Sequence, residues 1–325
     1  MEASAKDLQG MYLILNPKSG KGGRRSAKRN ALLRARVLRK QLGVELELLP
    51  TTHAGHATEL ARTHGGDALV RVVAIGGDGT VNETACGLIG GQSPLGIVPM
   101  GSGNGLARHL GIPLGPAAAV DLAFAGRVID MDCGTIGGRH FFTTAGVGLD
   151  AEVGWAFANL SGRGLANYIR ATTELFFRYR PKRYRITVDG QTMEREALMV
   201  TFANASQFGN NAIIAPAARV NDGWLDMVIV KPFPKVAIGV LASMLMSGRV
   251  DRVSYVESIR FQHAVVEMEG DSKGHVDGEP FELGGRFEVR VVPSALRAIA
   301  GGRAREVREL ERGGKGHGLL HRAMQ

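Results

Sequence analysis

The first part of the chain alternates between short apolar runs and segments whose apolar residues recur at helical spacing. The apolar runs predict strands at Tyr12–Leu15, Val44–Leu49, Leu69–Ile75 and Leu95–Pro99. The segments with helical spacing predict helices at Ser26–Leu42, Gly55–His64 and Val81–Ile89. Because strands and helices follow one another in turn, we expect a parallel, doubly wound α/β sheet here.

The pattern changes after about Arg127. From there on, the strand-like runs are short and are separated by Gly, Asn and Asp, which is typical of an antiparallel β-sandwich or barrel. Two helical segments interrupt them, at Leu165–Tyr179 and Lys235–Met246. The segment from Ser294 onward also has a helix-like pattern, and the Gly- and Arg-rich tail past Gly313 is predicted to be disordered.

This change divides the chain into two predicted domains. Residues 1–128 are expected to form the α/β domain, and residues 129–292 the β domain. We expect residues 293–312 to pack back onto the first domain and residues 313–325 to form a disordered tail.

Composition narrows the class of protein. Of the 325 residues, 44% are hydrophobic and 22% are charged, as in soluble globular proteins. Cys86 and Cys133 have no metal-binding spacing, which favours a reducing cytoplasm. No secretory signal is expected, and the longest apolar run, near Val236–Met246, is shorter than the roughly 20 residues of a membrane span. The formal charge of +9 fits either attraction to polyanions or ordinary solvated basicity.

Glycine-rich turns follow several of the predicted strands. In "LILNPKSGKGGRRSAKR" (Leu13–Arg29), a glycine-rich loop opens a basic helix, which suits a phosphate group but also fits an ordinary strand-to-helix turn. It is not a Walker A loop. In "VPMGSGNG" (Val98–Gly105), a strand again runs into glycines. Because the carboxyl ends of parallel strands meet at one edge of a sheet, we expect these turns to share a single rim.

The most informative turn is "VVAIGGDGTVNE" (Val72–Glu83). Its glycines would let the backbone approach a ligand closely, and Asp78 would serve a Mg²⁺ ion or accept hydrogen bonds. The side chains of Thr80 and Asn82 add neutral hydrogen-bonding groups. The alternative is a tight turn in which Asp78 caps a helix, although three glycines exceed what a cap needs.

Two acidic stretches lie in the predicted β domain. In "HVDGEPFE" (His275–Glu282), Asp277 and Glu279 are spaced to share one face of a strand and to divide base and metal duties, but Asp-Gly is also a strong hairpin-turn signal. In "VNDGWLDM" (Val220–Met227), Asp222 and Asp226 suit a cation, or the segment simply turns a hairpin.

A basic and aromatic stretch, "YIRATTELFFRYRPKRYR" (Tyr168–Arg185), has two explanations of equal weight. Aromatic residues interleaved with arginines suit an anionic surface, either a membrane or a nucleic acid. The same pattern fits a core-packing helix whose arginines extend their charged ends to solvent.

Taken together and in order, "NPKSG", "TTHAGHA", "GGDGTVNE", "PMGSGNGLARHLGIP", "DGWLD" and "VDGEP" resemble the diacylglycerol kinase catalytic-domain family. That family includes bacterial soluble lipid kinases, sphingosine kinases and ceramide kinases. The resemblance extends to about Ala300. It implies an N-terminal α/β domain like that of NAD kinases and phosphofructokinases, a C-terminal β-sandwich domain, and a cleft between them that binds ATP and lipid.

The resemblance also implies roles for individual residues. The expected nucleotide contacts are Asn16, Pro17, Lys18, Ser19, Gly20, Thr51, Gly76, Gly77, Asp78, Gly79, Thr80, Val81, Asn82 and Ser102. Glu279 matches the family's proton acceptor, and Asp277 and Asp78 complete the expected catalytic set. A structural Mg²⁺ would be held by the side chain of Asp222 and the backbone carbonyls of Arg219 and Trp224.

The activity implied is ATP-dependent phosphorylation of a lipid hydroxyl, on diacylglycerol or on a long-chain base such as sphingosine. "GSGN" with "NGLARHLGIP" resembles the sphingosine kinases more closely, and Asp150 falls near the acid that those enzymes place at the lipid amine. The alternatives are a soluble-substrate kinase like NAD kinase and a non-catalytic lipid-binding module. We expect a cytoplasmic protein in peripheral contact with the inner membrane face and no nucleic acid partner, and a homodimer stays open.

Overall fold

The computed structural model describes residues 8–19, 25–158, 174–270, 272–302 and 304. The chain forms two compact units, neither of which is one continuous stretch. The first unit takes its described residues from 1–101, 107–131 and 295–325. The second unit takes them from 102–106 and 132–294.

The first unit is built on a parallel sheet in the order β2-β1-β3-β4. The bounds are Gly10–Leu15 for β1, Glu45–Pro50 for β2, Val70–Gly76 for β3 and Leu95–Pro99 for β4. Leu13 of β1 lies between Leu48 of β2 and Val73 of β3. Strand β3 is buried from Arg71 to Gly76, as its continuous apolar run predicts for a central parallel strand.

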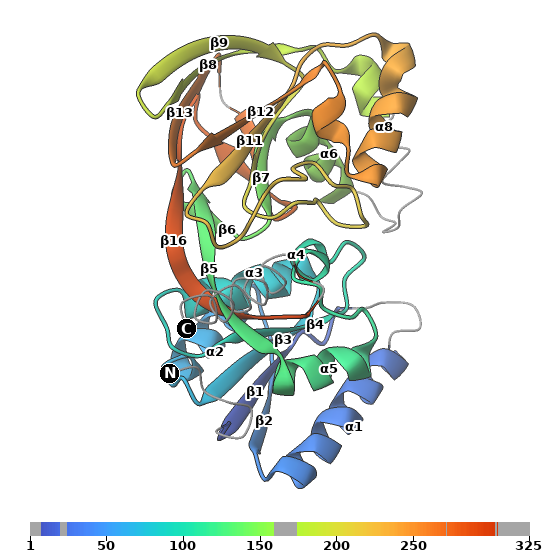
Figure 1. The fold of residues 1–325 in the computed structure, drawn as a ribbon, viewed down its shortest axis with the longest axis vertical. Coiled ribbons are helices and arrows are strands. Elements are labelled where there is room, and N and C mark those ends of the chain that lie inside the picture. Colours follow the sequence, from blue (N-terminus) through green and yellow to red (C-terminus); the bar gives the residue numbers. More distant parts are fainter. Residues whose placement is uncertain (1–7, 20–24, 159–173, 271, 303, 305–325) are drawn as a thin grey trace, which may run out of the picture. The chain divides into compact units, whose positions relative to one another are not determined.

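Helices cover both faces of this sheet, as Figure 1 shows. The bounds are Arg25–Leu42 for α1, His56–His64 for α2, Asp78–Leu88 for α3, Gly105–His109 for α4 and Pro116–Ala125 for α5. Helix α1 packs against α5, whereas α2 packs against α3. Right-handed crossovers place those pairs on opposite faces, because the chain steps from β1 to β2 and then back past β1 to β3. The predicted doubly wound α/β unit is confirmed.

Two long strands belong to both units. Strand β5 (Arg127–Ile136) leaves the first unit, and β16 (Arg286–Ala300) returns to it. The helix predicted from Ser294 onward is therefore wrong up to Ala300. Residues 295, 296 and 298–300 are buried, and Ala298 pairs with Leu95 of β4. Burial of nearly every residue is typical of a strand covered on both sides, and that tertiary contact overrides the helical propensity of the alanines.

The second unit has a six-stranded sheet in the order β12-β11-β10-β7-β14-β15. The bounds are Thr144–Gly148 for β7, Met199–Ala203 for β10, Leu225–Val230 for β11, Val256–Phe261 for β12, Ser272–Val276 for β14 and Glu279–Leu283 for β15. A second layer continues from β16 to β13, β8 and β9, with β6 paired to β5. Its remaining bounds are Arg139–Phe141 for β6, Lys182–Val188 for β8, Gln191–Ala197 for β9 and His263–Met268 for β13.

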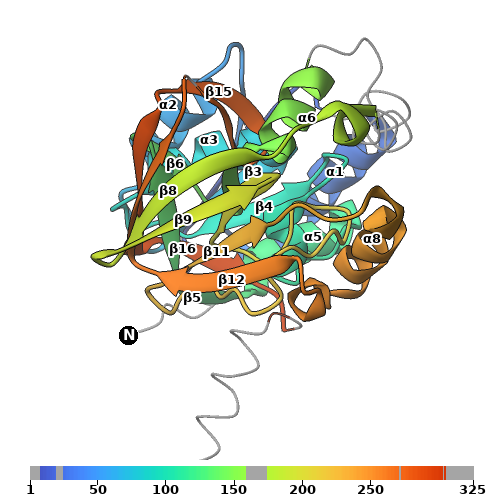
Figure 2. The ribbon, with the colours of Figure 1, turned by 90° about the horizontal axis from the view of Figure 1, so that it is seen from above.

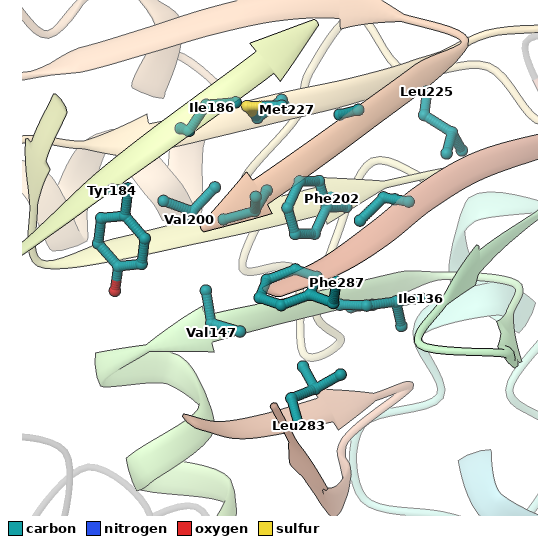
Figure 3. Packing of buried hydrophobic residues seen from close by; sticks show 14 of the residues in the cluster. Ile136, Val147, Tyr184, Ile186, Val200, Phe202, Leu225, Met227, Leu283 and Phe287 are labelled. Carbon is teal, nitrogen blue, oxygen red and sulfur yellow. The ribbon is translucent and has the colours of Figure 1, made fainter. Parts of the chain in front are cut away.

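The core of the second unit lies between these two layers (Figure 3). Phe202 of β10 packs edge-on against Phe287 of β16 and Phe261 of β12, with ring centroids 6.4 and 6.0 Å apart. Because β10 and β16 lie in different layers, the Phe202–Phe287 contact joins the two sheets face to face. The predicted antiparallel β-sandwich is confirmed.

Helical segments lie on the outside of this sandwich (Figure 2). The bounds are Leu149–Ala158 for α6, Lys235–Ala237 for η1, Ile238–Ser247 for α8 and Val250–Arg252 for η2. The helix predicted over Lys235–Met246 is confirmed. Of the helix predicted over Leu165–Tyr179, residues 174–178 are helical and residues 165–173 lie outside the described residues, as does the tail 313–325. Among the described residues, no helix combines the length and the apolar content needed to cross a bilayer.

Candidate functional site

In the first unit, a tight turn follows β1. The side-chain Oδ1 of Asn16 accepts the backbone N–H of Lys18 at 2.9 Å, and the Ser19 hydroxyl donates to the Asn16 carbonyl at 2.8 Å. From helix α1, Lys28 Nζ donates to the carbonyls of Asn16 and Pro17 at 3.0 and 2.8 Å. Partial burial lowers the pKa of Lys28. The sequence did not single out Lys28, which holds this turn in shape; Gly20 lies outside the described residues.

The Gly-Gly-Asp-Gly turn follows β3 and begins a helix at once. Strand β3 ends at Gly76 and helix α3 begins at Asp78, earlier than the predicted start at Val81. The N–H groups at the start of a helix have no partner within the helix, and the helix dipole makes that end favourable for negative charge. Asp78, Gly79 and Thr80 therefore form an N-terminal turn that suits a phosphate group.

The predicted rim of turns comes together in the first unit. Asn16 Nδ2 donates to Thr80 Oγ1 at 3.1 Å, which joins the first turn to the second. Met100 N–H donates to the Gly76 carbonyl at 2.7 Å, which joins the second turn to the third. A Cβ atom added at Gly77 would lie 3.2 Å from the Cα of Gly101, so the glycine keeps these two backbones in close approach.

Other predicted nucleotide contacts differ in their exposure. Thr51 follows β2 directly, and its N–H donates to the Leu15 carbonyl at 2.8 Å, so it stands at the same edge of the sheet. Asn82 is partly buried and accepts the Cys86 thiol. Val81 points into the core with its side chain 7% exposed. Ser102 belongs to the second unit.

In the second unit, Asp277 holds a chain segment in place. Asp277 and Gly278 both have positive φ angles, 47° and 85°, and form the two-residue turn between β14 and β15. The Asp277 carboxylate accepts the backbone N–H groups of Phe142, Thr143 and Thr144 at 3.0, 2.8 and 3.1 Å. It therefore fixes the link between β6 and β7, and the hairpin-turn interpretation of this stretch is confirmed.

Glu279 is placed differently. It is the first residue of β15 and is exposed, and no ion pair or side-chain hydrogen bond joins it to another described residue. The expectation that Asp277 and Glu279 share a strand face is wrong, because Asp277 lies in the turn rather than in the strand. One carboxylate is bound to backbone N–H groups and the other is available for chemistry.

A second acidic region lies around Asp222, where the resemblance implies a structural Mg²⁺. Asp222 Oδ2 accepts Arg260 Nη2 at 2.6 Å, and Oδ1 accepts the Trp224 N–H at 3.2 Å. The Arg260 guanidinium also lies over the Trp224 ring, 5.4 Å from its centroid. Arg219, the remaining implied ligand, is partly buried. Among the described residues, no cluster of three or more His, Cys, Asp or Glu side chains is arranged to hold a metal.

This arrangement does not fit a bound cation as it stands. Asp222 is the only ligand expected to bind the metal through its side chain, and Arg260 already neutralises that carboxylate. The metal site stays a prediction that requires Arg260 to release Asp222. Nearby, Asp226 is opposite Arg260 on the neighbouring strand, and burial raises the pKa of Asp226 to about 6 while Arg260 opposes that rise.

Asp132 is a residue of this region that sequence reasoning missed. Its carboxylate accepts the N–H groups of Ser294 and Gly223, each at 2.7 Å, and burial raises its pKa. Asn204 donates to the Asp132 carbonyl at 2.9 Å. Partners so distant along the chain leave no local signal in the sequence.

Asp150 is part of a buried polar cluster. It is the acid that the resemblance places near the amine of a sphingosine-like lipid. Its Oδ2 accepts the Thr201 hydroxyl at 2.7 Å and lies 3.2 Å from His275 Nε2. The side chains of Asp150 and His275 are 8% and 5% exposed. His275 Nδ1 is buried without a hydrogen-bond partner among the described residues. Burial also raises the pKa of neighbouring Tyr179 to about 12.

Two family models match the chain. The model described as "Diacylglycerol kinase catalytic domain" matches residues 10–136. The model described as "YegS C-terminal NAD kinase beta sandwich-like domain" matches residues 143–300. These descriptions agree with the α/β and β-sandwich units of the structure.

Individual relatives agree with the family models. A "Probable lipid kinase YegS-like" of Pseudomonas aeruginosa is 33% identical over 64% of this chain and 68% of its own length. The "Diacylglycerol kinase" of Bacillus subtilis is 29% identical over 82% of this chain and 88% of its own length.

Solved structures share the fold. A crystal structure of a diacylglycerol kinase from Bacillus anthracis has a TM-score of 0.65 at 20% identity and covers 90% of this chain and 97% of its own. An NAD kinase from Archaeoglobus fulgidus, in complex with ATP, has a TM-score of 0.50 at 14% identity and covers 92% of this chain and 97% of its own. The expected likeness to the NAD kinase fold is confirmed.

Proposed function

Because the chain belongs to the diacylglycerol kinase catalytic-domain family, we propose that it is an ATP-dependent lipid kinase. It would transfer the γ-phosphoryl group of ATP to a lipid hydroxyl. Diacylglycerol is the first candidate acceptor, since that substrate is named for the Bacillus subtilis relative.

The observation that carries this proposal is the meeting of the glycine-rich turns in the first unit. The hydrogen bonds from Asn16 to Thr80 and from Met100 to Gly76 bring these turns together at the carboxyl ends of β1, β3 and β4. Backbone N–H groups at such turns and at the start of α3 bind phosphate without a large side chain. Enzymes catalyse phosphoryl transfer mainly by positioning the reactants and by stabilising the charge on the phosphate groups.

Asp78 is the carboxylate that would hold the Mg²⁺ of the nucleotide. It is partly buried in the first turn of α3, and the flanking Gly77 and Gly79 carry no Cβ atom; a carboxylate oxygen is a ligand that suits a hard cation. When bound, Mg²⁺ supplies charge neutralisation to the phosphate groups.

Glu279 is the proposed proton acceptor. The lipid hydroxyl oxygen forms a bond to the γ-phosphorus of ATP, the bond from that phosphorus to the bridging oxygen breaks, and ADP leaves. The hydroxyl proton passes to the Glu279 carboxylate, which is exposed and unpaired among the described residues. Asp277 acts by holding the segment around Thr143 rather than by accepting the proton.

A long-chain base such as sphingosine is the second candidate acceptor, and Asp150 is the observation that favours it. Its buried carboxylate lies in the second unit beside His275, whose Nδ1 has no partner among the described residues. An amine would pair with such a carboxylate. If sphingosine is the acceptor, Asp150→Asn lowers turnover of sphingosine far more than turnover of diacylglycerol.

A direct assay tests the proposal. Labelled ATP is offered with diacylglycerol, monoacylglycerol, sphingosine and ceramide in mixed micelles, and separately with NAD. We expect label in a lipid product. Label in NADP instead would make the protein a soluble-substrate kinase, and lipid binding without ATP turnover would make it a non-catalytic lipid-binding module.

Two substitutions assign the roles. Glu279→Gln and Asp78→Asn are each expected to lower turnover by about 10²–10⁴-fold, the usual contribution of a positioned base or charged group. Both variants should keep the wild-type circular dichroism spectrum. Near-normal turnover in either would remove that residue from the proposed mechanism.

The substrate class also bears on where the protein works and with which partners. A lipid kinase must reach a substrate that lies in a bilayer, so we propose a cytoplasmic protein in peripheral contact with the inner membrane face. The same proposal needs no nucleic acid partner, and it is compatible with a monomer or a homodimer.

A further inference from the structure

Helix α8 is an apolar helix that the fold leaves at its surface. Its ten residues, Ile238–Ser247, include no charged side chain, and none of them is buried. A helix this apolar normally lies inside a protein core. Something other than the described chain is therefore expected to cover it.

The two sides of α8 have different surroundings. Leu241 and Leu245 pack against a core cluster of the second unit that includes Val250 and Val256. Val240 and Met246 face outward and are 55% and 57% exposed, and Val236, just before the helix, is 91% exposed. Within the described part of the chain, the helix is thus packed on one side and exposed on the other.

A further exposed apolar side chain, from another part of the chain, joins these three. Phe177 is 48% exposed, and Lys235 Nζ donates to its carbonyl at 2.9 Å while lying 5.4 Å from its ring centroid. The neighbouring Phe176 stacks on Phe233, with ring centroids 5.2 Å apart. We call Phe177, Val236, Val240 and Met246 the α8 surface.

Positive charge borders the α8 surface. Lys235 precedes the helix, Arg249 and Arg252 follow it, and Asp251 is the one acidic residue between positions 231 and 252. Exposed Arg178 follows Phe177 directly. Apolar side chains bordered by cations match a bilayer interface, where acyl chains lie beneath anionic headgroups.

We propose that the α8 surface docks this protein on an anionic lipid bilayer. Phe177, Val236, Val240 and Met246 enter the interface, and Lys235, Arg249 and Arg252 meet the headgroups. The helix is roughly 15 Å long, half of what crosses a bilayer core, so it lies in the interface rather than spanning it. The inference deepens the proposed function and rests on it, because a lipid kinase needs a place from which to reach its substrate.

Vesicle sedimentation tests this surface with the whole chain. We expect the wild type to bind vesicles of phosphatidylcholine and phosphatidylglycerol in equal parts, and to bind pure phosphatidylcholine vesicles more weakly. The double variant Val240→Asp/Met246→Asp is expected to bind vesicles at least about tenfold more weakly. Burying one apolar side chain in the bilayer interface should change the affinity by about tenfold. Unchanged affinity in the double variant overturns the proposal, as does a wild type that binds neither vesicle.

The matched control is Leu114→Asp. Leu114 is 45% exposed in the first unit, so its substitution replaces one exposed apolar side chain by one negative charge, which is half of the change made in the double variant. It should leave vesicle affinity unchanged. An equal loss in this control would mean that only net charge matters and would overturn the α8 surface.

Two further measurements distinguish membrane docking from a subunit contact and from a failure of the proposed kinase function. Light scattering without lipid should give the same mass for the wild type and the double variant; a dimer lost in the variant would make the surface a subunit contact instead. The variant should keep wild-type turnover on a dispersed short-chain diacylglycerol and lose it on diacylglycerol in vesicles. If the wild type binds vesicles through α8 but turns over no lipid, the surface stands and the proposed kinase function fails.

Discussion

The Asp277 carboxylate accepts the backbone N–H of Thr143 at 2.8 Å, although 134 positions separate the two residues along the chain. The same carboxylate also accepts the N–H groups of Phe142 and Thr144. Asp277 thus fixes the link between β6 and β7, whereas Glu279, two residues later, is exposed. The two acids of this short motif are therefore placed differently: Asp277 is bound to backbone N–H groups, and the proposed chemical role falls to the exposed Glu279.

Removing the Asp277 carboxylate should destabilise the fold. Asp277→Ala leaves buried backbone N–H groups unsatisfied, and we expect the free energy of unfolding to fall by about 2–4 kcal/mol. Urea denaturation measures the change. Glu279→Gln is the matched control, and its free energy of unfolding should stay within about 0.5 kcal/mol of the wild type. Equal stability of both variants would contradict the structural role of Asp277.

Breaking the bond between Asn16 and Thr80 should weaken nucleotide binding. Asn16→Ala and Thr80→Val each remove the 3.1 Å hydrogen bond that joins two turns of the rim. Each is expected to raise KM for ATP about tenfold, the value of one hydrogen bond. Since both variants lose the same bond, the double variant should be no worse than either single variant. Multiplying effects would show that the residues act independently.

The Glu257 carboxylate should stabilise the sandwich above acidic pH. Hydrogen bonds from Arg195 at 2.9 Å, together with Lys231 at 2.8 Å, lower the pKa of Glu257 from 4.5 to about 2. A lowered pKa adds stability above pH 4.5, and that stability is lost as pH falls toward 2.

We therefore expect Glu257→Gln to cost about 1 kcal/mol at neutral pH, a value reduced for solvent exposure. The difference from the wild type should disappear near the lowered pKa, as thermal unfolding across pH would show. Glu267→Gln, which breaks an exposed pair with Arg286, serves as the control and should change little.

Asp226 should act in the opposite direction. Burial raises its pKa from 3.8 to about 6, so the folded state holds the proton more tightly than the unfolded state. The wild type should therefore lose stability as pH rises through this interval. Asp226→Asn removes the ionising group and should be more stable than the wild type by about 1–3 kcal/mol at pH above 7. Parallel stability curves for the two proteins would contradict this.

Arg260 should make the Asp222 region independent of Mg²⁺. Because Arg260 neutralises Asp222 at 2.6 Å, the Tm of the nucleotide-free wild type should be the same in Mg²⁺ and in EDTA. In Arg260→Gln, Mg²⁺ should raise Tm, and adding Asp222→Asn should remove that effect. A wild-type Tm that depends on Mg²⁺ and loses this dependence in Asp222→Asn alone would restore the structural metal site.

The spacing of the apolar residues predicted most strands and helices of the first unit. A residue buried on a sheet or on a helix face repeats at a fixed spacing along the chain, and that spacing can be read from the sequence. Helix α3 begins at Asp78, earlier than the predicted start at Val81. The glycines around Asp78 suggested a loop in the sequence, which does not show the close contact between Gly77 and Gly101. Residues 294–300 were predicted to be helical because "SALRAIA" favours a helix locally, whereas pairing with β4 decides the structure.

The candidate site was predictable to a different degree. Turn residues such as Asp78 stand in recognisable local motifs. Asp132, Asn204 and Arg260 do not, because their partners lie far away along the chain. The exposure of α8 could not be predicted either, since an apolar segment looks the same in sequence whether the fold buries it or leaves it at the surface.

The pairing of Leu95 with Ala298 also has a consequence in time. A ribosome releases β4 about 200 residues before the strand that lies beside it, which at the usual rates of synthesis is a delay of roughly 10–40 s. Throughout that interval the sheet of the first unit has an open apolar edge. Such an edge is a template for pairing with other chains. The nascent protein is therefore at risk of aggregation from the release of β4 until residues 295–300 emerge and close the sheet.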